Sequence, residues 1–181
     1  MVGRTKREVV DAYNALGGRT YDLRYAEEQE SKYMLLLKRV HPEAADVVLD
    51  VGCGTGLLLQ KLNSRNVGLD ISPRLLSAAR SRVGSPHRDE LVQADAENLP
   101  FRDSVFNKTY SVTLIQNTPN PEKAIMEMKR VSRQGSKLAI TALKKGFSEG
   151  RFASLFEGAG LKSASFVFDD GLKDWVAFAV P

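Results

Sequence analysis

Short apolar runs alternate with amphipathic stretches from Asp46 to the end of the chain. The apolar runs predict strands near 46–51, 66–70, 90–94, 105–113, 136–142, 163–168 and 174–180. The stretches between them predict helices near 55–64, 72–83, 120–131 and 148–158. Strands that alternate with helices are typical of an α/β fold built around a mostly parallel sheet.

The last two apolar runs differ from the others because only a turn-like segment, Asp169-Asp170-Gly171, joins them. A connection of this kind predicts an antiparallel hairpin. We therefore expect a seven-stranded sheet that is parallel over most of its width and ends in a C-terminal hairpin.

The N-terminal region has helical signals but no evident chemistry. Thr5 and Glu8 have the spacing of a capping box, and Gly17-Gly18 end the run. Apolar residues at helical spacing predict a second helix from Ala26 to Val40.

A chain of 181 residues is long enough for one domain and short for two. We expect a single domain, with N-terminal helices over residues 1–44 and an α/β core over 45–181. The hydrophobic fraction of 43% and the charged fraction of 27% are ordinary for a globular protein, and no apolar stretch is long enough to span a bilayer. The basic start of the chain lacks the apolar core of a secretory signal, so we expect a cytoplasmic location.

Charge and cysteine content narrow the chemistry. Cys53 is the only cysteine, which excludes an intrachain disulfide and a cysteine-rich zinc site, and we expect no metal. The net charge of +4 allows an anionic partner but does not require one.

A glycine-rich loop follows the first predicted strand, in the sequence from Val48 to Gly56. Its glycines lack side chains, so the backbone can approach a ligand closely. The amides at the start of the following helix can bind a carboxylate, and Asp50 can lie close to a cationic group. In an open parallel sheet, ligands bind beyond the carboxyl ends of the strands.

The next two strands also end in candidate ligand-binding residues. Asp70 has the offset of a carboxylate that binds both hydroxyls of a ribose. Asp95 can accept a hydrogen bond from an exocyclic amine, and the Ala96 amide can bind a ring nitrogen. Each feature alone is more often a tight turn, a helix cap or a solvated loop residue, but their joint occurrence favours a nucleoside site. A dinucleotide dehydrogenase is disfavoured because Leu57 stands where its fingerprint ends in glycine.

These residues resemble the class I S-adenosylmethionine-dependent methyltransferases, whose first motif is similar to Val48–Gly56. The resemblance runs from about Asp46 to Leu143 and implies a Rossmann-like fold with helices on both faces. It also implies S-adenosylmethionine as cofactor and S-adenosylhomocysteine as product. The cofactor-binding residues expected from the pattern and the resemblance are Asp50, Gly52, Cys53, Gly54, Thr55, Gly56, Asp70, Ile71, Asp95, Ala96 and Thr113.

The methyl acceptor is expected at the end of the fourth strand, which lacks the Asn-Pro-Pro-aromatic tetrad of many N-methyltransferases. Gln116 and Asn117 offer amide groups that suit a nucleobase or amide edge, although a strand-end turn explains them equally well. Tyr13, Tyr21 and Tyr25 are candidates for a lid, and packing against the core is the simpler explanation for any one of them. The short segment after the fifth strand leaves no room for an inserted cap, so we expect an open rim lined by Lys144, Lys145 and Arg151.

Three functions remain open at this stage. The first is N-methylation of RNA (tRNA or rRNA) or of a translation-related protein, with or without a small zinc-binding activator subunit. The second is methylation of a small metabolite, with the N-terminal helices as the lid. The third is a non-catalytic subunit that binds the cofactor and stabilises a partner.

Overall fold

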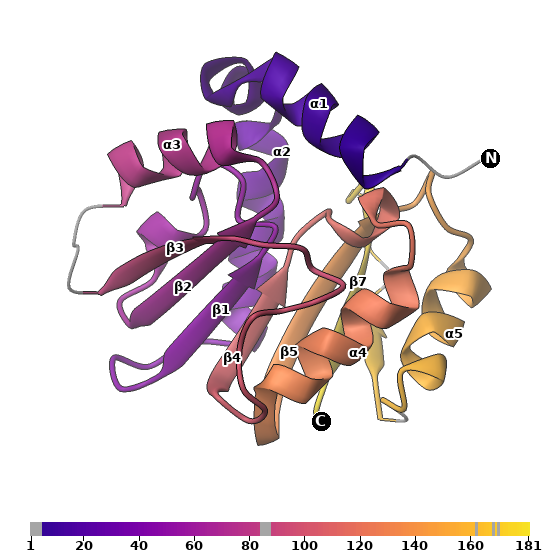
Figure 1. Cartoon of the computed structure of the whole chain (residues 1–181). Coiled ribbons are helices and arrows are strands. Elements are labelled where there is room, and N and C mark those ends of the chain that lie inside the picture. The colour runs from indigo at the N-terminus through magenta and orange to yellow at the C-terminus, as the bar shows by residue number, and fades with distance from the viewer. Residues whose placement is uncertain (1–4, 84–87, 162, 168, 170) are drawn as a thin grey trace.

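A seven-stranded sheet forms the centre of the molecule in the computed structural model, which describes residues 5–83, 88–161, 163–167, 169 and 171–181. The strands are β1 (Val47–Val51), β2 (Arg65–Asp70), β3 (Asp89–Gln93), β4 (Phe106–Ser111), β5 (Ser132–Leu143), β6 (Ser165–Val167) and β7 (Asp174–Ala179). Their order across the sheet is β3-β2-β1-β4-β5-β7-β6 (Figure 1). Strands β1 to β5 are parallel, and β7 is antiparallel to both β5 and β6. The predicted mostly parallel sheet with a C-terminal hairpin is confirmed.

The helices that flank the sheet are α3 (Pro73–Arg82), α4 (Pro121–Val131) and α5 (Glu149–Gly158). Each begins where the sequence provides a cap: Ser72, Asn120 and Ser148 accept hydrogen bonds from backbone amides in the first turn of their helices. These helices agree with the stretches predicted near 72–83, 120–131 and 148–158.

Two hydrophobic cores lie on opposite faces of the sheet. One packs α4 and α5 against strand residues such as Leu49 and Leu138, which are fully buried. The other packs the C-terminal half of α2 (Gly18–Arg39) and the segment after the glycine loop against Val48 and Tyr110. Helices therefore cover both faces, as the alternating pattern predicts.

The N-terminal region contains α1 (Lys6–Leu16) and α2, which meet at Gly17. The predicted capping box is present, because the Thr5 side chain accepts from the Glu8 amide while the Glu8 side chain accepts from the Thr5 amide. Gly17 has φ +70°, a left-handed conformation that favours glycine and lets the chain turn sharply between the helices. The second helix starts at Gly18 and not near residue 26, because this glycine pair forms a bend between two helices and does not begin a loop.

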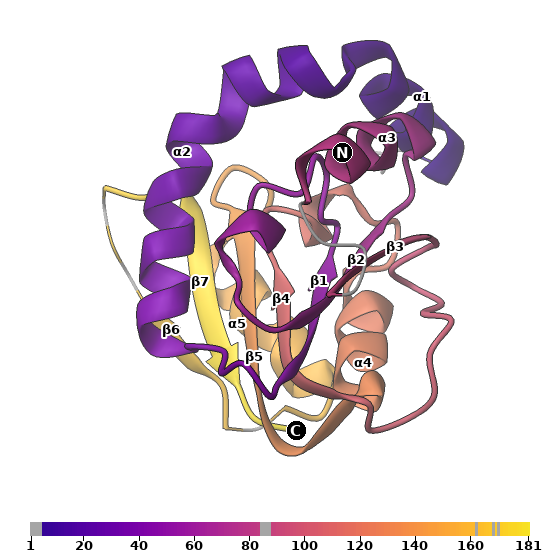
Figure 2. The same ribbon diagram turned by 90° about the vertical axis from the view of Figure 1, so that its left-hand side faces the viewer.

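The two N-terminal helices lie differently on the core. The lower part of α2 runs along one face of the sheet, and its upper part extends past the carboxyl ends of the strands to join α1 (Figure 2). Helix α1 then crosses above those strand ends and contacts α3 (Figure 1). This arrangement places α1 over the edge where ligands bind in open parallel sheets.

The helix predicted over residues 55–64 is wrong. Turns follow the glycine loop, and the only helical piece there is a short 3₁₀ segment, Leu59–Lys61. Leu58, Leu59 and Leu62 are buried against the sheet, so the segment follows the surface that buries these side chains. The expected anion site at a helix N-terminus therefore does not exist after this loop.

The turn expected to join β6 and β7 lies partly outside the described residues, because Phe168 and Asp170 belong to the part of the chain that is not described. The hairpin itself is defined by the antiparallel pairs from Ser165 with Phe178 to Val167 with Val176. None of the described helices combines the length and apolar character needed to cross a membrane.

Candidate active site

A cavity lies between α1 and the carboxyl ends of β1, β2, β3 and β4. The lining residues come from the glycine loop, from the two later strand ends and from the N-terminal helices. They include Gly52, Gly54, Asp70, Ile71, Asp95, Ala96 and Thr113 from the predicted cofactor set, together with Lys6, Val9, Tyr13, Tyr21, Leu114 and Asn117.

The glycine loop forms the wall of the cavity next to β1. Gly52 and Gly54 have φ values of +80° and +54°, in the left-handed region that favours glycine. A Cβ on Gly52 would lie 2.9 Å from the Leu114 side chain, and one on Gly54 would lie 3.5 Å from the ring of Tyr21. A side chain would therefore crowd Leu114 at Gly52, whereas at Gly54 the contact is an ordinary one and only the backbone conformation favours glycine. The loop backbone is thus left open to a ligand.

Asp70 ends β2 and is held by the backbone on both sides. Its two carboxylate oxygens accept hydrogen bonds from the Gly54 amide at 2.9 Å and the Ser72 amide at 2.8 Å. Burial raises the pKa of Asp70, although bonds from backbone amides act in the opposite direction. The carboxylate is thus fixed in the cavity wall, with lone pairs left for a ligand hydroxyl.

Asp50, near the end of β1, is a buried carboxylate with 2% exposure. Burial, together with the nearby negative charge of Asp70, raises the pKa of Asp50 to about 8. A buried carboxylate of this kind is stabilised by a nearby cationic group. The role of Asp50 toward the cofactor stays a prediction.

Asp95 follows β3 and has three partners. Its carboxylate accepts hydrogen bonds from the Glu97 amide, the Asn98 side chain and Lys6 of α1. Burial raises the pKa of Asp95, but the bonds from Lys6 and Glu97 outweigh it, so the pKa lies below its ordinary value. Asp95 is ionised in the neutral range and is occupied by a side chain of the helix above it.

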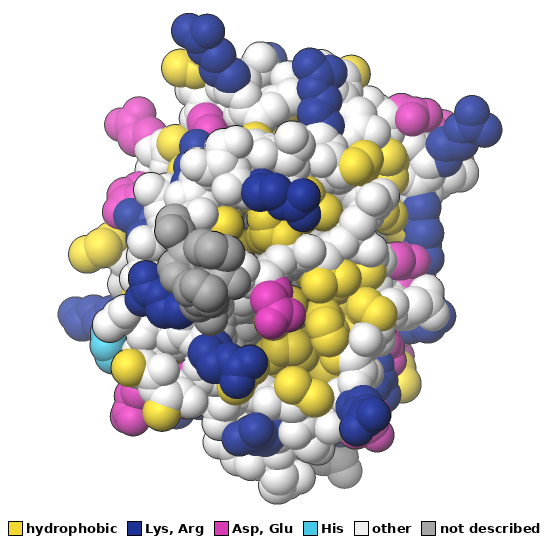
Figure 3. Space-filling model, turned by 60° about the vertical axis from the view of Figure 1, so that its left-hand side comes forward, with side chains coloured by type: hydrophobic (Ala, Val, Ile, Leu, Met, Phe, Trp, Pro, Cys, Tyr) yellow, Lys and Arg dark blue, Asp and Glu magenta, His cyan; other side chains and the backbone are white. Residues whose placement is uncertain are grey.

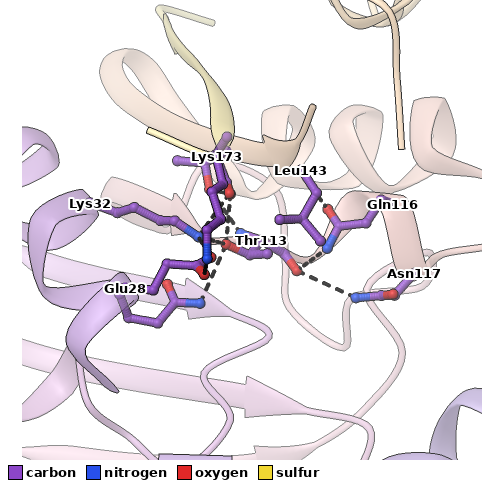
Figure 4. A network of polar contacts seen from close by, with 10 residues as sticks. Glu28, Lys32, Thr113, Gln116, Asn117, Leu143 and Lys173 are labelled. Carbon is purple, nitrogen blue, oxygen red and sulfur yellow. Dashed lines mark hydrogen bonds and ion pairs between the residues drawn. The ribbon is translucent and has the colours of Figure 1, made fainter. Parts of the chain in front are cut away.

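The residues predicted to meet the methyl acceptor have different surroundings. The side-chain amide of Gln116 donates to the carbonyl of Thr113, and its oxygen accepts from the Leu143 amide at 3.4 Å (Figure 4). Asn117 donates to the Tyr13 hydroxyl at 3.0 Å and to the Thr113 carbonyl at 3.4 Å. Asn117 lines the cavity, whereas the Gln116 side chain is bonded to the backbone of the loop at Thr113 and to the backbone at the end of β5.

Three tyrosines of the N-terminal helices gather above the glycine loop. The ring centroids of Tyr13 and Tyr21 are 6.3 Å apart, and those of Tyr21 and Tyr25 are 5.1 Å apart. Burial keeps the pKa of Tyr21 far above its usual value, so its phenol stays protonated. Tyr13 and Tyr21 line the cavity, and Tyr25 supports Tyr21 from the side.

Several predicted site residues do not line the cavity, as far as the structure describes it. These are Asp50, Cys53, Thr55, Gly56, Gln116, Tyr25, Lys144, Lys145 and Arg151. Cys53 is buried, and burial raises the pKa of its thiol. Thr55 donates to Asp22 of α2 at 2.6 Å, and Lys144 lies 5.1 Å above the Trp175 ring. Thr55 and Lys144 therefore hold neighbouring elements together.

The sequence interpretation missed Lys6, Val9 and Leu114 as lining residues. The capping box at Thr5 showed that α1 exists, but a helical pattern contains no information about which end of the sheet the helix covers. No cluster of three or more metal-binding side chains occurs in the part of the chain that the structure describes.

Residues 49–140 match a family model described as methyltransferase domain. A malonyl-[acyl-carrier protein] O-methyltransferase of Marinomonas sp. is 34% identical over 146 residues, which is 78% of this chain and 53% of the relative. A phosphatidylethanolamine N-methyltransferase of Cereibacter sphaeroides is 34% identical over 125 residues, which is 66% of this chain and 61% of the relative. The chain thus spans little more than half the length of these relatives.

The fold is also found among solved structures. A chain from the complex between the Haloferax volcanii Trm112 methyltransferase activator and the putative methyltransferase superposes with a TM-score of 0.75. It shares 17% identity, and the match covers 93% of this chain and 96% of that chain. Likeness at this level of identity shows the fold.

Proposed function

This chain belongs to the methyltransferase-domain family, and we propose that it transfers a methyl group from S-adenosylmethionine to a small organic acceptor enclosed under α1. The single observation that carries the choice of acceptor is the position of α1 over the cavity, which Lys6, Val9 and Tyr13 of this helix line.

The cavity residues fit S-adenosylmethionine, which supplies an electrophilic methyl group on a sulfonium when bound. The bare backbone at Gly52 and Gly54 leaves space for its methionine part. Asp50 is outside the cavity lining, but its buried carboxylate, two residues before the loop, suits a nearby positive charge. Asp70 and Asp95 offer oxygens to the ribose hydroxyls and the adenine amine. These assignments follow the order of strand ends β1, β2 and β3.

The acceptor side of the cavity is formed by α1 and by the loop after β4. Asn117 uses its amide nitrogen on Tyr13 and on the Thr113 carbonyl, which leaves its oxygen to accept a hydrogen bond from an N–H or O–H of an acceptor. Methyl transfer is an in-line displacement, so holding the nucleophile in place supplies much of the rate enhancement. The chain's contribution is to orient the acceptor and to exclude water.

Enclosure argues for a small acceptor. Four contacts tie the described part of the N-terminal segment to the rim of the cavity: Lys6 with Asp95 and Glu97, Tyr13 with Asn117, and Asn14 with Ser72. A nucleic acid or folded protein could reach the methyl-transfer position only if these contacts opened. A metabolite, or a lipid headgroup on a flexible chain, needs a much smaller opening.

The expected RNA acceptor and the lysine-lined rim remain predictions with less support. Basic side chains on the face shown in Figure 3 are scattered among acidic and apolar ones and do not form a continuous patch. Lys144 is engaged by Trp175 and by the carbonyl of Asp169. The names of the two curated relatives refer to malonyl-[acyl-carrier protein] and to phosphatidylethanolamine, which supports a small acceptor group carried on a larger molecule.

A small activator subunit also remains a prediction. The structural relative from Haloferax volcanii comes from a complex with such an activator, at an identity that reflects shared fold. Affinity purification of the tagged chain from its native cells tests the prediction directly. Recovery of the chain without a stoichiometric small subunit would remove it.

The acceptor class can be tested with radiolabelled S-adenosylmethionine and pools extracted from cells that lack this protein. Four pools are compared: organic-soluble lipids, water-soluble metabolites, RNA and protein. We expect label in the lipid or metabolite pool, and less label with the Asp70→Ala variant when the cofactor is below saturation.

Label confined to RNA or protein would overturn the small-acceptor proposal. Cofactor binding by calorimetry without label in any pool would favour the non-catalytic alternative. The labelled compound is then identified by its mass, which gives the acceptor atom.

A further inference from the structure

A fully buried lysine lies at the back of the acceptor loop. The side chain of Lys32, from the middle of α2, has 0% exposure, as has that of Asp174 at the start of β7. Lys32 Nζ lies 2.8 Å from Asp174 Oδ1, 2.9 Å from the Thr113 hydroxyl and 3.0 Å from Glu28 (Figure 4). Lysine is among the residues least often fully buried, so this arrangement needs a physical reason.

The network converges on Thr113, which follows β4 and lines the cavity. Its hydroxyl accepts from Lys32 and donates to Asp174 Oδ2 at 2.7 Å. Its amide donates to the Thr141 hydroxyl at 2.9 Å, and Thr141 donates in turn to Asp174 Oδ2 at 2.8 Å. Every polar group of Thr113 is therefore bonded.

Thr113 also has φ +58°, a left-handed conformation that is unfavourable for a β-branched residue. Its carbonyl accepts from the side chains of Gln116 and Asn117. The conformation of Thr113 thus sets the direction from which the loop 114–118 folds over the cavity. Strained residues of this kind persist only where their surroundings fix them, and they cluster at functional sites.

We propose that Lys32 and Asp174 are positioning residues for methyl transfer, which hold Thr113 and through it the acceptor-side loop 114–118 against the cofactor cavity. The proposal rests on the proposed function, because it assigns a role within the same site. It explains why a charged pair occurs where apolar side chains of similar volume would fold as well or better.

Helix α2 connects this network to the other wall of the cavity. Asp22, three turns before Lys32, accepts from the Thr55 hydroxyl of the glycine loop at 2.6 Å and pairs with Arg82 of α3. The same helix therefore fixes the loop after β1 at one point and the loop after β4 at another. Methyl transfer requires the groups on these two walls to keep a fixed distance, and a rigid helix bonded to both provides it.

The test compares two variants with matched controls. Lys32→Met combined with Asp174→Asn removes both charges while leaving an amide oxygen for the hydroxyls of Thr113 and Thr141. Its control is Glu30→Gln combined with Lys61→Met, which removes an exposed ion pair of 2.8 Å that also connects α2 to the core. Thr113→Val and Thr113→Ser form a second pair, because both keep a Cβ on the strained backbone and only serine keeps the hydroxyl.

Hydrogen exchange of the peptide covering residues 113–119, measured by mass spectrometry, reports how often the loop opens. This measurement does not require the acceptor to be known. We expect exchange to rise by about tenfold or more in the charge-free variant and in Thr113→Val, with little change in Thr113→Ser and the surface control. Methyl transfer to the labelled pool should fall in the charge-free variant and in Thr113→Val, and should change little in Thr113→Ser and the surface control. Binding of S-adenosylhomocysteine should change by less than about threefold in all of them.

Unchanged exchange at 113–119 in a folded charge-free variant would overturn the proposal. Exchange that rises equally over the whole sheet would also overturn it, because that result indicates a role in global stability alone. If the charge-free variant does not fold, the Thr113→Val and Thr113→Ser pair tests the proposal by the same two measurements, hydrogen exchange at 113–119 and methyl transfer. Absence of methyl transfer by the unmodified protein would count against the proposed function and leave the exchange result intact.

Discussion

Lys6 on α1 bonds to Asp95, the carboxylate that is expected to bind the adenine amine. The same Nζ lies 2.9 Å from Glu97, so one lysine of α1 contacts both Asp95 and Glu97 after β3. Lys6 therefore takes up part of the hydrogen-bonding capacity of Asp95 when α1 covers the cavity. Entry of a cofactor must rearrange this contact, and Glu97 provides the position to which Lys6 can shift.

The first prediction concerns the exchange of cofactor through this contact. Replacing Lys6 with Met removes a competitor for Asp95 and also one tie of α1 to the rim. We expect the association and dissociation rates of S-adenosylhomocysteine to rise together by roughly three- to tenfold, with a much smaller change in affinity, because a partly exposed ion pair contributes about 1 kcal/mol or less. Stopped-flow fluorescence measures both rates.

Arg7→Met is the control for this experiment, since Arg7 lies on the same helix, is 92% exposed and pairs only with Asp11 among the described acidic residues. Rates in Lys6→Met that match those of the unmodified protein and of Arg7→Met would show that Lys6 does not govern access to the cavity.

The second prediction concerns the pH dependence of stability caused by Asp50. Its pKa in the folded protein is about 8, against an ordinary value of 3.8, so the folded state binds an additional proton between these values. The contribution of Asp50 to stability must therefore fall as pH rises from about 4 to about 8. In Asp50→Asn this fall should be absent. Thermal unfolding measured from about pH 4 to about pH 8 should therefore give a flatter stability profile for the variant. A profile that is the same in both proteins would contradict the raised pKa.

The third prediction follows from the same proton. A cationic cofactor favours ionised Asp50, so binding near pH 7 should release up to about one proton. Calorimetry in two buffers with different ionisation enthalpies detects this release as a difference between the observed binding enthalpies. The difference should disappear in Asp50→Asn. Equal enthalpies in both buffers for the unmodified protein would show that Asp50 is already ionised or does not contact the cation.

The fourth prediction concerns Asp70 as the ribose ligand. Replacing it with Ala should weaken S-adenosylmethionine binding by about 1–3 kcal/mol, because charge-assisted hydrogen bonds are lost. Asp103→Ala is the control, since Asp103 is 73% exposed and pairs with Arg130 at a distance from the cavity lining. Unchanged affinity in Asp70→Ala, with the protein still folded, would remove the ribose assignment.

The fifth prediction separates backbone strain from ligand space in the glycine loop. Gly52 and Gly135 have similar φ values of +80° and +74°, but a Cβ would meet Leu114 at the first and nothing within 4 Å at the second. Gly52→Ala and Gly135→Ala should both lose stability, by on the order of 1 kcal/mol from strain. Only Gly52→Ala should also weaken cofactor binding, by about tenfold or more. Equal cofactor affinity in the two variants would exclude close approach of the ligand at Gly52.

Much of the fold could be predicted from the sequence because its signals are local. Alternating apolar runs define the strands, and the capping residues Thr5, Ser72, Asn120 and Ser148 define where four helices begin. The failure at residues 55–64 has a local reason as well. Leucines at helical spacing also suit an irregular segment, provided that the surface beneath it buries them.

The site residues likewise divide into those that local sequence predicts and those that it does not. Gly52, Asp70 and Asp95 were predicted because each follows a strand directly, and the carboxyl ends of parallel strands meet at one edge. Lys6, Val9 and Lys32 were not assigned to the site, because helical periodicity shows which side of a helix is apolar and gives no information about what that side covers. The roles of the two lysines depend on contacts with residues far away in the sequence, such as Asp95 and Thr113.

The sequence by itself therefore determined the elements, their order and the cofactor edge of the sheet, since each depends on neighbouring residues. Only the tertiary structure decided that α1 covers this edge, that Lys6 contacts Asp95 and that Lys32 is buried with Asp174. These contacts form because packing α2 against the sheet places distant charges within bonding distance, and no local pattern in the chain encodes that distance.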